Sequence, residues 1–156
     1  MRRRRAAKRD VLPDPKYNSK LVSKFINVVM ERGKKSIAER IVYESLEVLQ
    51  KKAGKGEALD LLEKAFDNTR PLLQLKSRRV GGATYQVPIE VNAERGIAIA
   101  MRWVRNFSRS RKGGPMGERL GQELFDAYQK QGAAIKKRDD THKMAEANKA
   151  FSHFKW

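Results

Sequence analysis

Apolar residues recur every third or fourth position along most of the chain, and this spacing predicts a series of amphipathic helices. The first is expected between Ser19 and Arg32, with Ser19 as its N-cap and Gly33 as its stop. Its hydrophobic arc is formed by Leu21, Val22, Phe25, Ile26, Val29 and Met30.

Two further helices are predicted before Pro71. The second is expected to open with a capping box of Ser36 and Glu39 and to end near Gly54. The third is expected to stop before Pro71, which cannot continue a helix. The apolar positions that we expect in the core are Ile41, Val42, Leu46, Val48, Leu49, Leu61, Leu62, Ala65 and Phe66.

The second half of the chain predicts three more helices. One is capped by Asn92 and runs to about Arg109, and the next is closed by Gly132. The last begins near residue 133 and has only a thin apolar face, so we expect it at the periphery of the fold. That face consists of Met144, Ala147 and Phe151.

Between these two groups of helices, at about residues 72–91, the period changes from helical to alternating, which predicts a β-hairpin. A two-residue turn at Gly81-Gly82 would place Arg78 opposite Tyr85, mixing charge into the apolar face. An odd-length loop instead pairs Leu75 with Val87. Because register follows the face that must be buried, we favour the odd loop.

Length and charge constrain what such a chain can be. A chain of 156 residues predicts one mainly α domain at 19–156, preceded by a basic arm at 1–18 and ending in a helix and tail at 133–156. A net charge of +17 predicts a polyanionic partner. The aromatic tail that ends at Trp156 either stacks on bases or a partner, or folds back onto the core.

The excess cations fall in a few places, which we expect to contact nucleic acid. On the fourth helix, at about 100° per residue, four arginines form a stripe with no acidic residue in it. The planar fork of arginine suits phosphate. The predicted contacts are Arg2, Arg3, Arg4, Arg5, Lys8, Arg9, Lys34, Lys35, Lys76, Arg78, Arg79, Arg95, Arg102, Arg105, Arg109, Arg111 and Lys112.

Several chemistries find no support in the sequence. There is no cysteine, and neither His142 nor His153 has the spacing of a metal ligand. No phosphate-binding glycine motif or catalytic set occurs, so we expect no enzyme, cofactor, metal or small-molecule substrate. No apolar run approaches the roughly 18 residues of a membrane span, and no signal peptide is visible, so we expect a cytoplasmic protein.

The segment Ser77-Arg-Arg-Val-Gly-Gly-Ala-Thr-Tyr-Gln-Val-Pro-Ile-Glu-Val91 resembles the bacterial small-subunit ribosomal protein seven family. So do Asp14-Pro-Lys-Tyr-Asn18, Gly132-Ala-Ala-Ile-Lys-Lys-Arg138 and Thr141-His-Lys-Met-Ala-Glu-Ala-Asn-Lys-Ala-Phe151. The resemblance covers nearly the whole chain. It departs in a short N-terminus and in a divergent stretch at 106–116.

The resemblance implies a bundle of six helices with a β-hairpin between helices three and four. It implies primary binding to the 3′ major domain of 16S rRNA, nucleation of head assembly, and ribosomal proteins nine, eleven, thirteen and nineteen as neighbours. It also places hairpin and last-helix residues near exit-site tRNA and mRNA. These are Val80, Gly81, Gly82, Ala83, Tyr85, Lys136, Lys137, Arg138, Lys143 and Asn148.

The residues alone leave alternatives open. Dispersed basic elements suit a folded RNA, whose deep groove is read by shape and phosphate contacts. A nucleoid-type DNA-binding protein is the second hypothesis, although no helix-turn-helix signature appears. A nucleic-acid enzyme is the third, but no acid, base or metal set can be named for it.

Overall fold

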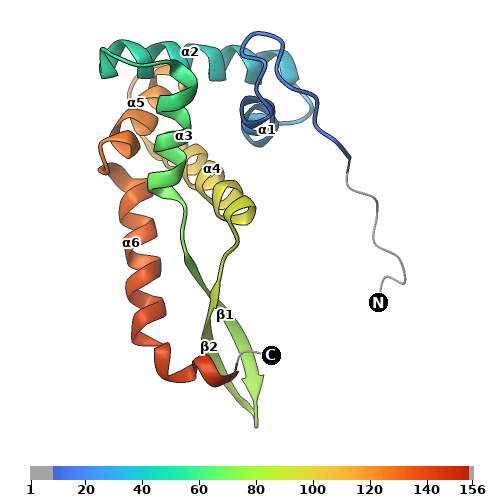
Figure 1. The fold of residues 1–156 in the computed structure, drawn as a ribbon, viewed down its shortest axis with the longest axis vertical. Coiled ribbons are helices and arrows are strands. Elements are labelled where there is room, and N and C mark those ends of the chain that lie inside the picture. Colours follow the sequence, from blue (N-terminus) through green and yellow to red (C-terminus); the bar gives the residue numbers. More distant parts are fainter. Residues whose placement is uncertain (1–8, 155–156) are drawn as a thin grey trace.

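Six α-helices and one two-stranded antiparallel sheet make up residues 9–154, which are the residues that this computed structural model describes (Figure 1). The hairpin lies between the third and fourth helices, which confirms the expected mainly α architecture. In chain order the elements are α1 Lys20–Val29, α2 Lys35–Ala53, α3 Ala58–Thr69, β1 Leu73–Val80, β2 Ala83–Glu90, α4 Ala93–Ser110, α5 Met116–Tyr128, α6 Gly132–Ala147 and the 3₁₀ helix η1 Lys149–Phe154.

Helices α1 to α5 pack around one hydrophobic core, and the apolar arcs predicted from sequence face it. In α1 the fully buried positions include Phe25, whose ring meets that of Phe66 from α3 edge-to-face, with centroids 5.1 Å apart. Leu46 of α2 and Leu124 of α5 are also fully buried. Burial of such side chains is the main stabilising contribution to the bundle.

Helices α2 and α5 pack closely because α5 carries two glycines at their contact, which the pattern of apolar positions did not reveal. A Cβ added at Gly121 would lie 2.7 Å from Cβ of Val48 and 2.9 Å from the carbonyl oxygen of Ser45. One turn earlier, a Cβ at Gly117 would collide with the side chain of Glu44. The absence of side chains at these two positions lets the helix backbones approach each other.

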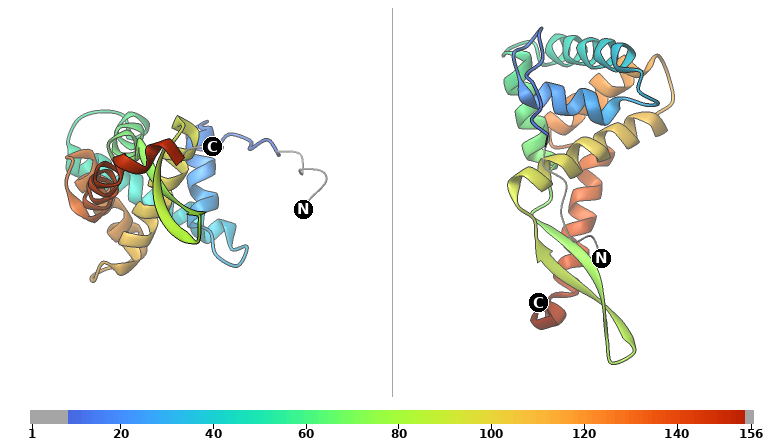
Figure 2. Two further views of the ribbon diagram at one scale, coloured as in Figure 1. Left: turned by 90° about the horizontal axis from the view of Figure 1, so that it is seen from below. Right: turned by 90° about the vertical axis from the view of Figure 1, so that its right-hand side faces the viewer.

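The hairpin and α6 extend together away from the bundle (Figures 1 and 2). The base of the hairpin is joined to α6 by a hydrogen bond: the backbone N–H of Leu72 donates to Nε2 of His142, at 3.0 Å. Farther out, η1 folds back onto β2, with the rings of Phe151 and Tyr85 5.2 Å apart. Phe151 thus packs on the hairpin and not on the helical core, a contact that neither of the two alternatives for the tail described.

The register of the hairpin is the one that the sequence analysis rejected. Arg78 pairs with Tyr85 and Lys76 with Val87 across a two-residue turn at Gly81 and Gly82. Both glycines have positive φ, 57° and 89°, as expected of the type I′ turn that matches the strand twist. The prediction was wrong because the geometry of the two-residue turn set the register. The hairpin buries only part of one face, so burial does not determine the register here.

That face is nevertheless partly apolar. Val87 is fully buried although it lies opposite the exposed Lys76. Tyr85 lies on the same face and meets η1. A long lysine side chain can sit beside an apolar neighbour while its ammonium group stays in water, so the mixed pairing is tolerated.

Some predicted helix ends were right and others were not. Asn92 caps α4, its Oδ1 accepting from the backbone N–H of Arg95 at 3.0 Å, and Gly54 ends α2 with φ 70°. Ser19 occupies the N-cap position of α1 but makes no side-chain cap bond. Ser36 is not a cap, because α2 starts one residue earlier with Lys34 as its N-cap.

The last two helices also begin and end differently from expectation. Helix α5 ends at Tyr128, and Gly132, with φ 91°, opens α6 rather than closing α5. The buried positions of α6 are Ala134, Ile135 and Ala145, whereas the predicted apolar residue Met144 is 53% exposed. Two of these three residues are alanines, which do not stand out in a search for large apolar side chains, so the contact face was not recognised.

Candidate nucleic-acid interface

Helix α4 carries the predicted arginine stripe along a face that the core does not cover. Arg95, Arg102 and Arg109 are exposed and Arg105 is half-buried. Arg102 donates from Nε only to the carbonyl of Ala98 in its own helix, at 3.2 Å. Its guanidinium Nη atoms make no hydrogen bond to any of the residues that the structure describes, so they remain available to a phosphate.

Two members of the stripe also serve the fold. Nη1 of Arg105 donates to the carbonyl of Val28 at 3.1 Å, which ties α4 to α1. Nη2 of Arg109 lies 2.6 Å from a carboxylate oxygen of Glu31 in the α1–α2 connection. The stripe is therefore not purely basic in three dimensions, since its acidic neighbour comes from a distant part of the sequence.

The α1–α2 connection brings Lys34 to the same region. Lys34, Glu31 and Arg109 line one groove together with Arg119 of α5. Lys35 is exposed, and its ammonium group lies 3.9 Å from the carboxylate of Glu39, one turn along α2. The structure thus joins two sequence-predicted clusters, Lys34–Lys35 and the end of the stripe.

The hairpin leads into α4 through two residues and presents cations beside the stripe. Lys76 and Arg79 are exposed, while Arg78 is half-buried opposite Tyr85. Nη2 of Arg95 lies 3.4 Å from Oε1 of Gln74, a weak hydrogen bond that connects the start of α4 to β1. The start of α4 therefore lies beside the base of β1, and farther out Lys76 and Arg79 point to opposite faces of the hairpin.

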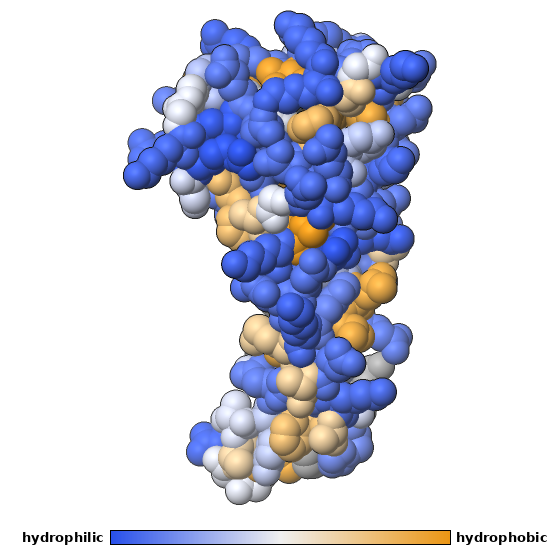
Figure 3. Space-filling model, turned by 90° about the vertical axis from the view of Figure 1, so that its left-hand side faces the viewer, coloured by the Kyte–Doolittle hydropathy of each residue, from blue (hydrophilic) through white to orange (hydrophobic). Residues whose placement is uncertain are grey.

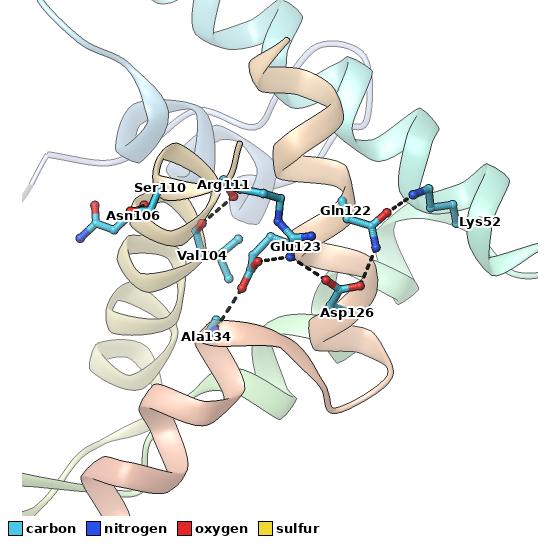
Figure 4. Close-up of polar contacts among 10 residues, drawn as sticks. Lys52, Val104, Asn106, Ser110, Arg111, Gln122, Glu123, Asp126 and Ala134 are labelled. Atoms are coloured by element: carbon cyan, nitrogen blue, oxygen red, sulfur yellow. Dashed lines mark hydrogen bonds and ion pairs between the residues drawn. The ribbon is translucent and has the colours of Figure 1, made fainter. Parts of the chain in front are cut away.

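Arg111, which the sequence analysis placed in a basic loop, turns toward the protein interior instead. Its Nη2 lies 2.5 Å from Oε2 of Glu123 and 2.6 Å from Oδ2 of Asp126 (Figure 4). Glu123 is 1% exposed, and its other oxygen accepts from the backbone N–H of Ala134 at 3.0 Å. Burial opposes the charge of Arg111, but the hydrogen bonds to the two carboxylates outweigh it and raise its pKa.

This cluster joins three parts of the fold. Arg111 follows α4, Glu123 and Asp126 belong to α5, and Ala134 lies in the first turn of α6 (Figure 4). Glu123 therefore acts as a cap for α6, a helix that begins nine residues later in the chain, at Gly132. Sequence reasoning missed it because a buried glutamate has no local signature.

On α6 the predicted cations divide into two kinds. Lys136, Lys137 and Lys143 are exposed. Arg138 is instead part of the fold: Nη1 donates to the carbonyl of Asn68 in α3, and Nη2 lies 2.6 Å from Oδ1 of Asp139. Asn148, at the end of α6, donates to the carbonyl of Met144 at 2.7 Å.

The basic arm is anchored where it enters the described part of the chain. Asp14 is 2% exposed; its Oδ2 accepts from the backbone N–H groups of Lys16 and Tyr17, each at 3.0 Å. Its Oδ1 accepts from the hydroxyl of Tyr43 in α2 at 2.7 Å. Burial, followed by the bond to Asp14, raises the pKa of Tyr43 to about 12.

The position of the arm is therefore fixed at Asp14, although the sequence analysis treated residues 1–18 as outside the core. Arg9 is exposed, whereas Arg2, Arg3, Arg4, Arg5 and Lys8 lie outside the described residues. Aspartate before a proline is a common turn opener, and this was the signal that could have predicted the anchor.

The surface around these elements is mainly hydrophilic. Figure 3 shows the face that bears α6, where hydrophobic side chains form small groups within a hydrophilic surface. Residues 9–154 contain no cluster of three or more His, Cys, Asp or Glu side chains placed to hold a metal ion. Within the same range no helix combines the length and the apolar character that a membrane crossing requires.

Comparison with known proteins decides the family. Residues 1–149 match the family model for ribosomal protein S7p/S5e. The chain belongs to this family. As a member it is a structural protein of the small ribosomal subunit and not an enzyme.

Relatives match over almost their whole length. The small ribosomal subunit protein uS7 of Syntrophobacter fumaroxidans is 57% identical over 155 residues, which are 99% of this chain and 99% of the relative. The uS7 protein of Nautilia profundicola is 58% identical over 156 residues, covering all of both chains. That of Francisella tularensis is 54% identical over 155 residues. The match therefore spans almost the whole of this chain and of each of these relatives.

Proposed function

We propose that the chain is a primary binding protein of 16S rRNA, attached to the 3′ major domain, and that its binding nucleates assembly of the head of the small subunit. The observation that carries the proposal is the set of exposed cations on α4 and on the hairpin that leads directly into it. Arg95 and Arg102 on the helix and Lys76 and Arg79 on the hairpin are all exposed there. Guanidinium groups in this arrangement can grip several backbone phosphates at once.

A folded RNA fits this surface better than duplex DNA does. The cations come from the basic N-terminal arm, the α1–α2 connection, the hairpin, α4 and α6. The hairpin extends away from the bundle (Figure 1). Such dispersed contacts suit an irregular RNA that is read by its shape and phosphates. DNA binding of the nucleoid type remains the alternative that the experiment below distinguishes.

The finer placement within the ribosome is also part of the proposal. The hairpin tip, Val80–Ala83, together with Tyr85 and the exposed lysines of α6, would lie near exit-site tRNA and the mRNA path. Proteins nine, eleven, thirteen and nineteen would be neighbours. The projection of the tip beyond the bundle supports a role apart from primary RNA binding (Figure 1).

The test is a binding competition on two matched variants. Arg95→Ala with Arg102→Ala removes two exposed cations of the interface, and Arg40→Ala with Lys55→Ala removes two exposed cations elsewhere. Hydrogen bonds to a charged group contribute about 1.5–3 kcal/mol each, so the interface pair should lower affinity for a 3′ major domain fragment at least tenfold. The control pair should change this affinity less than threefold, which is about the effect expected of substitutions at the surface away from a binding site.

Two results would contradict the proposal. Equal affinity of the two double variants would show that α4 does not contact the RNA. Effective competition by duplex DNA of equal length would favour the DNA-binding alternative. The tip is tested separately: deletion of Val80–Ala83 should leave incorporation into small subunits intact and alter reading-frame maintenance, whereas loss of incorporation would contradict that division of roles.

A further inference from the structure

A second basic groove lies on the other side of the α4–α5 connection, between that connection and the C-terminal end of α2. It encloses about 630 Å³ and is lined by five cations and by one carboxylate, that of Glu118. Three of the lining cations, Lys51, Lys52 and Arg119, were not among the predicted contacts. The groove is therefore a separate feature from the surface of α4 and the hairpin.

Four of the five cations have charge to offer a ligand. The exception is Arg111, because Glu123 and Asp126 already neutralise it. Lys51 and Lys112 are exposed, and neither forms an ion pair with any described residue. Lys52 donates to Oε1 of Gln122, a neutral partner that holds the ammonium group without cancelling its charge (Figure 4).

Arg119 completes the groove and is held in an unusual way. Its Nη1 donates to the backbone carbonyl of Arg109 in the last turn of α4, at 3.3 Å, and to that of Arg111 in the α4–α5 connection, at 2.9 Å. Its buried Nε has no hydrogen-bond partner among the described residues. Carbonyl oxygens fix the guanidinium in place but leave its positive charge uncompensated.

The same arginine connects the two basic regions. Arg119 lines this groove and also the groove formed by Glu31, Lys34 and Arg109 at the end of the α4 stripe. The two grooves are thus neighbours on either side of one side chain. A strand of RNA that leaves the stripe at Arg109 can pass Arg119 and the α4–α5 connection to reach Lys51 and Lys52.

We propose that this groove, formed by Lys51, Lys52, Lys112 and Arg119, binds backbone phosphates of the same RNA and so extends the interface around the α4–α5 connection to the α2 side of the bundle. The inference rests on the proposed function for the identity of the RNA. The alternative is a purely structural role, in which Lys51 and Lys52 stabilise α2 by lying at the negative, C-terminal end of its dipole. A dipole role predicts a loss of stability but no loss of affinity.

The experiment compares Lys51→Ala with Lys52→Ala against a charge-matched control, Lys55→Ala with Lys64→Ala, whose residues do not line the groove. Binding to the 3′ major domain fragment is measured over a range of salt. Two lost phosphate contacts should make the slope of log K against log salt shallower by about 1.4–1.8. The control should keep the wild-type slope, and Lys51→Arg with Lys52→Arg should restore it. Melting temperatures are measured for all four proteins.

A second experiment distinguishes binding of RNA phosphates from binding of a free polyanion. Tripolyphosphate is titrated into the free protein, and the amide NMR signals of Gly113 and Gly114 are followed. Weak binding that needs millimolar ligand, with RNA affinity sensitive to Lys51 and Lys52, supports the proposal. Micromolar tripolyphosphate binding combined with unchanged RNA affinity of the groove variant would overturn the assignment to RNA.

The outcomes also distinguish this inference from the proposed function. If the groove variant and its control bind RNA alike while Arg95→Ala with Arg102→Ala binds weakly, the groove is not part of the interface and the proposed function stands. If none of the three double variants changes RNA affinity, both are wrong.

Discussion

The helical bundle and the arm formed by the hairpin and α6 are built by different means. In the bundle, large apolar side chains such as Phe25, Leu46 and Leu124 are fully buried. In the arm the fully buried residue of the hairpin is Val87, and the rest is held by small residues, a ring contact and a few hydrogen bonds. The difference separates a part whose stability comes from burial from a part that is positioned for contact with a partner.

The same difference sorts the arginines. Those at the junction of bundle and arm, Arg111 and Arg138, point at carboxylates and carbonyls of the protein. Those of α4 and the hairpin that lie on the surface, such as Arg79 and Arg102, have room for a phosphate. A basic sequence therefore contains two populations of arginine that composition alone cannot tell apart.

The largest expected effect comes from breaking the junction itself. Glu123→Ala removes a buried partner of Arg111 and the acceptor of the Ala134 N–H, so it should lower the free energy of unfolding by about 3 kcal/mol. Glu118→Ala, an exposed position on the same helix, should change it by less than about 0.5 kcal/mol. Urea unfolding measures both, and equal stabilities would show that the cluster does not hold α6 to the bundle.

The next effect tests close packing inside the bundle. Gly121→Ala places a Cβ against Val48, and overpacking of this kind should cost about 1–3 kcal/mol despite the better helix propensity of alanine. Gly96→Ala in α4 is the control, because its nearest neighbours are 3.4 Å away, an ordinary contact. Thermal unfolding should separate the two. Equal melting temperatures of the two variants would contradict this account of the packing.

The anchor of the basic arm should contribute less. Tyr43→Phe removes the hydroxyl that donates to Asp14 and should cost about 1.5 kcal/mol. Because the folded pKa of Tyr43, about 12, lies above its unfolded value of 10.0, the anchor contributes fully below pH 10 and is lost as pH rises from 10 to 12. Stability measured at pH 8 and pH 11 should therefore fall more for wild type than for Tyr43→Phe; parallel curves would contradict this.

The smallest global effect is expected at the hairpin tip. Gly81→Ala with Gly82→Ala strains two positions of positive φ and should open the turn locally. Because this part of the arm can open without unfolding the bundle, the melting temperature should stay nearly unchanged. Hydrogen exchange of the Val80 and Ala83 amides, which belong to the pair that closes the turn, should become faster. A marked drop in melting temperature would mean that bundle and arm unfold as one unit.

Sequence reasoning succeeded where burial dictates the structure. Helical spacing predicted the core faces of α1 to α5, and the Asn92 cap was confirmed. It failed on the hairpin register, where turn geometry outweighs a weak apolar face, and on α6, whose contacts use Ala134 and Ala145. Neither Glu31 near Arg109 nor Glu123 near Arg111 could be anticipated, since these partners come from other elements and only the fold brings them together.

The central claim is that cations from several elements, α4 and the hairpin foremost among them, hold RNA phosphates while the core only supports them. The salt dependence of binding to a 3′ major domain fragment tests it most directly. Each neutralised phosphate contributes roughly 0.7–0.9 to the slope of log K against log salt, so about ten contacts predict a slope of about −7 to −9. A slope near −2, from about two or three contacts, would show that most of these cations face solvent and would contradict the account.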